Sequence, residues 1–275
     1  MARQTVKQSA WPWALLAVLA ATGLAAALGL TQDPYAQDFM ARNQGPSPAH
    51  WLGTDQFGRD LMSRLMAGAW LTLSVAAGAT LMALLGGAGV ALAACMIGGW
   101  VRAAVFTVFD LLRTLPPILV GLAIMTALGA GTVTVIFAIG LTFAPLFAYI
   151  ASAAYDRERL AGYAMAARLM GGSTLSVAWR HMLPNIAGAL ITQAAIVMPR
   201  AVTTESVLSF LGVGVAPDTP TWGRIIAAAS EYAEEAPLSL AVPVLTLACT
   251  TLALSLIGHR LRRAERLDPV PEATP

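Results

Sequence analysis

Long apolar runs alternate with short polar segments along the whole chain. A helix needs about 20 mainly apolar residues to cross the roughly 30 Å hydrocarbon core of a membrane. Six runs approach or exceed this length, at residues 13–30, 71–98, 103–128, 133–151, 185–211 and 238–257. The pattern therefore predicts an all-α membrane protein with six transmembrane helices.

The first run has an alternative interpretation. Arg3 and Lys7 precede it and small residues lie near its end, as in a secretory signal peptide. We expect an uncleaved anchor instead, because five further apolar runs follow and because this run is longer than a usual signal-peptide core.

The composition agrees with a lipid environment. The chain is 57% hydrophobic and only 12% charged, with a mean hydropathy of +0.67. An ordinary soluble domain is about 25% charged. This low charge is too little to cover a soluble globule, so we expect much of the surface to face lipid.

The placement of basic residues predicts the orientation. If the N-terminus is cytoplasmic, eleven of the 17 lysines and arginines fall in cytoplasmic segments, four in outer loops and two within spans. This excess inside predicts that both termini are cytoplasmic. The chain then divides into a cytoplasmic N-terminus (1–10), a first helix with an outer loop (11–70), a transmembrane domain (71–257) and a cytoplasmic tail (258–275).

Two features predict how the helices pack. Small residues recur every four positions on one face of the second span, which lets two backbones approach closely within lipid; they are Ala79, Ala83, Gly87 and Ala91. Prolines interrupt four spans, and each should kink its helix; they are Pro116 and Pro117, Pro145, Pro199 and Pro243.

The cytoplasmic segment 155–184 carries a helix–turn–helix pattern. Residues 163–170 favour a helix that Gly171 and Gly172 should end. Ser173 can cap a second short helix that runs to about Met182, and Pro184 then starts the next span. We expect two helices that lie along the membrane surface and form a small protrusion, which could enter a groove on a partner protein. A plain amphipathic linker between spans is the alternative.

The spacing in this segment is similar to the EAA loop of ABC importer permeases. Ala166 and Ala167, then Gly171, His181 and the Leu183–Pro184 pair match that motif. The resemblance implies a loop that enters a cleft of an ATPase subunit and transmits its closure; the candidate residues are Tyr163, Met165, Ala166, Ala167, Arg168, Gly171, His181, Leu183 and Pro184. Met165 stands where the family usually has Glu, so a charge that could contact the ATPase is absent, and His181 stands where the family generally has Ile.

Two outer segments narrow the resemblance. Residues 50–65 and 205–223, with the Leu-Asp-Pro sequence at 267–269, resemble the second permease of dipeptide, oligopeptide and nickel importers, which has a MetI-like transmembrane domain. The candidate outer-loop residues are Gly53, Thr54, Asp55, Gly58, Arg59 and Asp60. They could seat a binding protein or pack the loop on the bundle, and both interpretations remain open.

Interfacial elements are expected beside these motifs. Residues 60–68 can form a short amphipathic helix at the membrane surface, with Trp51 and Trp70 as anchors. Trp222 suits the interface as well.

Arg200 and Glu205 are ionisable residues within the fifth span. Such residues are costly in a membrane and therefore suggest a function. They are five positions apart and do not share a helix face. We hypothesise that both line or gate a translocation pathway near its outer mouth; an ion pair with another helix or with a partner permease is the alternative.

The resemblance implies an importer subunit of the prokaryotic inner membrane. It would move peptides, nickel or a related solute inward by alternating access. The partners would be a second permease subunit, two ATP-binding subunits that hold ATP and Mg, a substrate-binding protein outside and the lipid bilayer, with no nucleic acid. We expect neither a cofactor nor a catalytic residue in this chain, because it has no GxxxxGK[ST] loop and no nucleophile–base pair.

No metal site is expected. His50 is predicted outside, and His181 and His259 inside. Two other classes stay as alternatives. An ion-coupled carrier would need ionisable relays at mid-membrane, and an intramembrane enzyme would need a catalytic dyad or metal motif.

Overall fold

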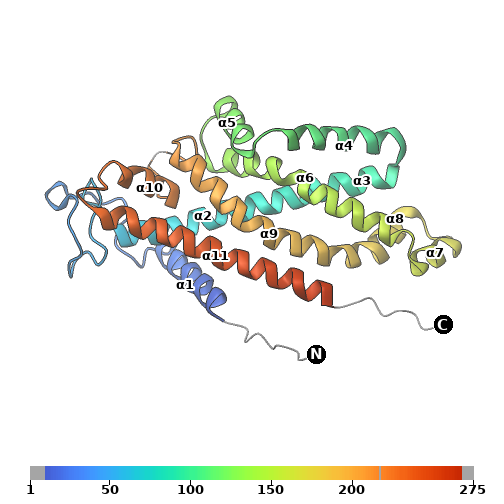
Figure 1. The fold of residues 1–275 in the computed structure, drawn as a ribbon, viewed down its shortest axis with the longest axis horizontal. Coiled ribbons are helices and arrows are strands. Elements are labelled where there is room, and N and C mark those ends of the chain that lie inside the picture. The colour runs from blue at the N-terminus through green and yellow to red at the C-terminus, as the bar shows by residue number, and fades with distance from the viewer. Residues whose placement is uncertain (1–9, 217, 268–275) are drawn as a thin grey trace.

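A computed structural model describes residues 10–216 and 218–267. It is an elongated helical bundle, and the outer segments and the predicted coupling loop lie at its opposite ends (Figure 1). The predicted segment 1–10, Pro217 and the 267–269 sequence lie wholly or mostly outside the described residues. The all-α prediction is confirmed over the part of the chain that the structure describes.

Four helical stretches in the described residues are long and apolar enough to cross a membrane. They are Leu61–Ile97 (α2, Leu61–Ala83; the π-helical turn η2, Leu84–Ala88; and α3, Gly89–Ile97), α6 (Thr132–Glu158), Thr174–Phe210 and Pro237–Ala264, within α11 (Pro237–Leu267). The first apolar helix, α1 (Trp11–Ala27), is shorter, at 17 residues. That the chain crosses the membrane six times, with both termini in the cytoplasm, therefore stays a prediction.

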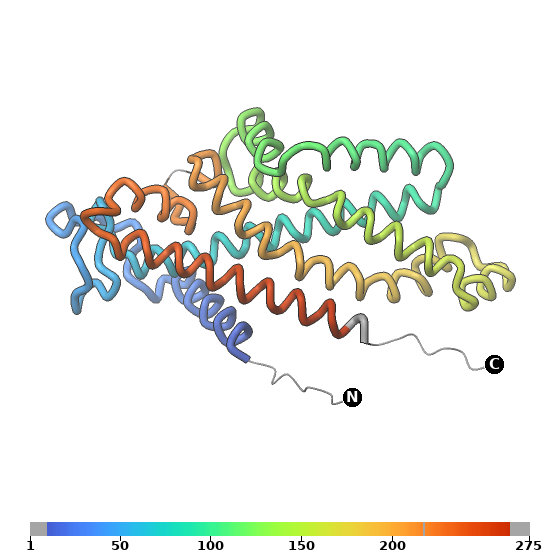
Figure 2. The backbone as a smooth tube through the Cα atoms, viewed as in Figure 1, coloured from blue at the N-terminus to red at the C-terminus, as the bar shows by residue number. Residues whose placement is uncertain are grey.

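The predicted third span is not one continuous helix. It consists of α4 (Gly99–Thr114) and α5 (Pro117–Leu128), whose axes differ by 99°. Leu115 and Pro116 between them are both extended, because a residue that precedes proline is driven out of the helical region. The chain therefore turns sharply at this point (Figure 2).

The predicted short interfacial helix at residues 60–68 is wrong as a separate element. Asp60 caps α2, which continues from Leu61 into the membrane span without a break. The reason is that Leu61, Leu65 and Ala69 are buried on the same face as Thr72, so one apolar stripe crosses the expected boundary.

The interfacial position expected for Trp222 is also wrong. Trp222 begins α10 (Trp222–Ser230) and is fully buried. Its indole Nε1 donates a hydrogen bond to the Leu65 carbonyl at 3.1 Å, and Gly68 makes room for the ring. A residue that seemed suited to the lipid headgroups instead locks the outer helix α10 onto α2.

The predicted stripe of small residues packs helices together, as expected. Ala79, Ala83, Gly87 and Ala91 are all buried. A methyl group at Gly87 would overlap the backbone carbonyl of Ala144 in α6. The π-helical turn η2 therefore approaches α6 backbone to backbone at the one position that lacks a side chain.

Gly87→Ala should lower the thermal midpoint of the solubilised transporter. The added methyl group has to displace backbone, and overpacking of this kind costs about 1–3 kcal/mol. Gly86→Ala is the matched control, because nothing lies within 4 Å of a methyl group there. Equal midpoints for the two variants would contradict the close approach.

Candidate functional site

The cytoplasmic loop has the glycine turn that its sequence predicts. Helix α7 (Gly162–Leu169) ends before Gly171, whose φ of +88° is a conformation that favours glycine. Ser173 then caps α8 (Thr174–Val177), and its hydroxyl accepts from the Ser176 N–H at 3.2 Å. Among the nine candidate coupling residues, only Ala167 and Leu183 are half-buried and the others are exposed.

The second half of this loop differs from the prediction. Helix α8, the π-helical turn η3 (Ala178–Met182) and α9 (Leu183–Phe210) form one continuous 37-residue helix. Pro184 lies in the first turn of α9, as predicted, but α9 follows η3 without a break. The loop and the fifth predicted span are therefore parts of one helix, with a π-helical turn between them.

A polar cluster fixes the loop to the bundle. The Tyr163 hydroxyl donates to Glu158 at the end of α6, and the Asn185 side-chain amide donates to the Tyr163 oxygen at 2.9 Å. Partial desolvation and then the bond to Glu158 raise the pKa of Tyr163, so its phenol stays protonated and keeps donating. Arg157 pairs with the other oxygen of Glu158 at 3.0 Å. Three segments of the chain are thereby held together.

Sequence reasoning found Tyr163 in this cluster but missed Glu158 and Asn185. Glu158 lies between Arg157 and Arg159, where it looks like an ordinary charge at the end of a membrane helix. The sequence did offer one signal for Glu158. It is the only acidic residue between positions 157 and 181, where the other charged residues are basic.

The loop presents an apolar surface outward. Leu169 is 89% exposed, and four other large apolar residues between positions 165 and 179 are also exposed. The larger members are Met165, Leu169, Met170, Leu175 and Trp179. Large exposed apolar side chains mark contacts with another protein or with the membrane. Leu175 and Trp179 also line an apolar cavity beside α3 and η2.

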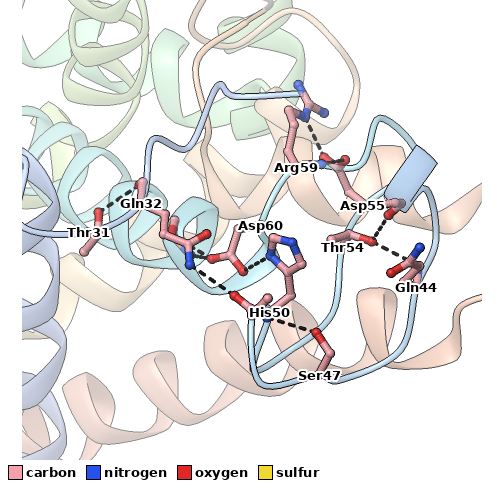
Figure 3. Close-up of polar contacts among 12 residues, drawn as sticks. Thr31, Gln32, Gln44, Ser47, His50, Thr54, Asp55, Arg59 and Asp60 are labelled. Atoms are coloured by element: carbon pink, nitrogen blue, oxygen red, sulfur yellow. Dashed lines mark hydrogen bonds and ion pairs between the residues drawn. The ribbon is translucent and has the colours of Figure 1, made fainter. Parts of the chain in front are cut away.

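The outer-loop motif forms a compact hydrogen-bonded turn (Figure 3). Asp55 accepts hydrogen bonds from the backbone of Phe57 and Arg59 and pairs with the Arg59 side chain at 2.7 Å. Asp60 accepts from the Ser63 backbone at 2.7 Å and contacts His50 Nδ1 at 3.0 Å. The carboxylates thus organise the loop and the start of α2.

The remaining motif residues complete the turn. Thr54 is buried and donates to the Ala41 carbonyl. Gly53 and Gly58 have φ of +82° and +73°, and a methyl group at Gly58 would overlap the Asp38 carbonyl. The motif is therefore an internal scaffold, while Trp51, 73% exposed, lies on the outer surface that it holds in place.

Asp55→Ala should destabilise this loop by about 3–5 kcal/mol, because it leaves the nearly buried Arg59 and Arg64 without their carboxylate. Limited proteolysis from the outer side should then cleave the loop faster than in the wild type. Asp33→Ala is the control, since Asp33 is exposed and bonds only the nearby Tyr35 backbone. Equal cleavage rates for both variants would count against the scaffold.

Arg200 and Glu205 are separated by the structure. Glu205 is 0% exposed and accepts a hydrogen bond from the Ser209 hydroxyl at 2.7 Å. Arg200 is exposed and lines a cavity of about 610 Å³ together with residues of α11. Glu205 does not line this cavity, so a pathway role remains a prediction that the geometry supports more directly for Arg200.

A helix kink lies next to Arg200. Pro199 cannot donate to the Ala195 carbonyl, which is therefore free of its usual helix partner. Helix α11 approaches at this point, because a methyl group on Gly258 would lie 2.7 Å from that carbonyl. The kink, the close approach and the cavity thus occur at one level of the bundle.

Comparison with known proteins now assigns the family. Residues 83–265 match the model of the binding-protein-dependent transport system inner membrane component, which is more than half of the chain. The chain belongs to this family of transport permeases. It is a multi-pass inner-membrane component of an ABC importer, and it is a transport subunit.

Relatives of the permease are peptide permeases by name. It is 32% identical to the dipeptide transport system permease of Alkalihalophilus pseudofirmus over 87% of this chain and 79% of that protein. It is 35% identical to a di/tripeptide permease of Pseudomonas aeruginosa (82% and 74%), and 32% identical to a glutathione permease of Pectobacterium atrosepticum (84% and 76%).

The fold has a solved counterpart. The permease matches a subunit of the MetNI methionine ABC transporter, described in inward-facing conformations, with a TM-score of 0.62 over 74% of this chain and 97% of that one. At 18% identity, this likeness establishes the MetI-like fold alone.

Proposed function

We propose that this permease is one membrane subunit of a peptide importer and that it passes dipeptides or similarly small peptides inward. The support is identity of 32–35% with permeases named for dipeptides, di/tripeptides and glutathione, over more than four fifths of the chain. Nickel or a metal chelate is a weaker candidate cargo, because it rests on the sequence resemblance alone. An ion-coupled carrier is not favoured, since the family is dependent on a binding protein.

The exposed apolar loop is the observation that carries the coupling mechanism. Its surface around Leu169 and Trp179 is suited to a cleft on an ATPase subunit. The cluster of Glu158, Tyr163 and Asn185 makes the loop move together with α6 and α9. Closure of the ATPase pair would then push a continuous helix instead of a flexible linker.

The same helix would carry that motion to the pathway. Between the loop and Arg200, the helix from Thr174 to Phe210 has two irregular points, the wide turn η3 and the proline at 199. Such irregularities are places where a helix bends. Displacement at the loop would therefore change the shape of the cavity beside Arg200, as alternating access requires.

The assembly would contain four other chains. A second permease would complete the pathway, two ATP-binding subunits would hold ATP and Mg, and a binding protein would dock on the outer surface around Trp51. This chain would need no cofactor of its own.

The cargo can be tested by uptake. Cells that lack this gene should lose uptake of a labelled dipeptide and keep uptake of labelled nickel, and the gene supplied in trans should restore the dipeptide uptake. Depletion of ATP should abolish the restored uptake, whereas collapse of the proton gradient at constant ATP should not. Loss of nickel uptake alone would instead identify a metal permease.

Gly171→Val should reduce transport by about five- to thirty-fold. A β-branched residue at positive φ costs about 1–2 kcal/mol and would distort the docking turn. Gly162→Val is the matched control, because Gly162 lies in the same loop with negative φ and nothing within 4 Å. ATP-driven uptake in proteoliposomes measures the effect, and normal uptake by Gly171→Val would argue for a passive linker.

A further inference from the structure

A cationic, hydroxyl-lined cavity lies between α9 and α11. The larger part has a volume of about 610 Å³, and an adjoining part of about 300 Å³ shares Ile196, Arg200 and Arg262 with it. The polar groups in the larger part come from Arg200, Thr203, Thr204, Thr251, Ser255, His259 and Arg262. Figures 1 and 2 show the two helices running side by side at this level.

The backbone geometry builds this cavity. Gly258 lets α11 close onto the free carbonyl of Ala195, which places the next residue, His259, against α9. On the other side, Pro199 kinks α9 immediately before Arg200. The cationic side chains are thus positioned by irregular points in both helices.

The cavity carries positive charge that the described part of the chain does not neutralise. No Asp or Glu lines either part, and within the described residues Arg200, His259 and Arg262 have no ion pair or hydrogen bond. A guanidinium cannot lose its proton, and an unpaired charge near a membrane interior is costly. The site is therefore complementary to an anion.

Its donors fit a carboxylate. Two guanidinium groups each present a planar fork of N–H donors that matches two carboxylate oxygens, and hydroxyl groups can donate beside them. A hydrophobic solute would leave these donors unpaired, and a metal cation would be repelled by the two guanidinium groups. The lining thus selects by charge as well as by shape.

We propose that this cavity binds a carboxylate group of the solute while it crosses the membrane. The inference rests on the proposed import of peptides, because every free peptide carries a C-terminal carboxylate. Two other anions could fill the same place, namely an acidic side chain of the partner permease and a lipid phosphate, and the experiments below separate these sources.

The first experiment measures the charge of the cavity in the assembled transporter in nanodiscs. Ser255→Cys is introduced after Cys95 and Cys249 are replaced by alanine, and its reaction with a negatively charged methanethiosulfonate is compared with a positively charged one. The anionic reagent should react about tenfold faster or more, because a cationic cleft concentrates anions. Arg200→Gln should remove most of this preference.

Arg263→Gln is the matched control for this experiment. Arg263 is exposed on the same helix and does not line the cavity, so the preference should survive its loss. Equal rates for the two reagents in the wild type would mean that a partner carboxylate neutralises the cavity, and would overturn the proposal.

The second experiment identifies the anion. A dipeptide with a free C-terminus should slow modification of Ser255→Cys, whereas its C-terminal amide should not. A lipid phosphate would make protection independent of either peptide and would overturn the proposal. Arg200→Gln should lower dipeptide uptake about tenfold and should reduce the ratio of dipeptide uptake to amide uptake. Arg200→Lys should restore part of the dipeptide uptake.

The controls separate this proposal from the proposed function. The binding protein's affinity for the dipeptide and the recovery of the complete complex should be unchanged by Arg200→Gln. If the wild type moves neither peptide, the importer proposal fails. The cavity proposal alone is wrong if the wild type moves the dipeptide and Arg200→Gln keeps the wild-type ratio of dipeptide uptake to amide uptake. It is also wrong if Arg200→Gln breaks the complex apart.

Discussion

Direct backbone contact between helices is the constraint on which this bundle depends. Lipid removes the hydrophobic drive that joins helices in water, so association relies on close packing. Glycines provide it at three levels, where a methyl group would meet a carbonyl: Gly87 against Ala144, Gly223 against Ser206 and Gly258 against Ala195. These contacts join η2 to α6, α10 to α9, and α11 to α9, and the last of them holds together the two helices that supply most of the cavity lining.

The two ends of the permease are built on different principles. At the outer end, buried carboxylates accept several hydrogen bonds and hold a long irregular loop, as Asp55 and Asp60 do. At the end predicted to be cytoplasmic, one small cluster around Glu158 fixes a loop whose larger side chains remain exposed. The first arrangement stabilises a surface, whereas the second leaves apolar groups available to a partner while preventing the loop from moving alone.

The continuous helix from Thr174 to Phe210 connects these ends. It begins in the coupling loop, passes the kink at Pro199 beside the cavity, and ends near Glu205, whose carboxylate is buried in the outer half of the bundle. A continuous helix that reaches all three regions is a physical basis for coupling between them. The wide turn and the proline are the points at which its shape can change.

Hydropathy, backbone conformation and residue size are local properties, so they were enough to predict the helical membrane class, the glycine turn at Gly171, the cap at Ser173 and the packing role of Gly87. Contacts between distant parts of the chain were needed to see that α2 starts at Leu61, that Pro184 lies within a continuous helix, and that Trp222 is buried. They were also needed to see that Arg200 and Arg262 line one cavity while Glu205 lies apart. Each of these depends on which residues distant in the chain fill the adjacent space, and a periodic pattern along one segment carries no information about its neighbours.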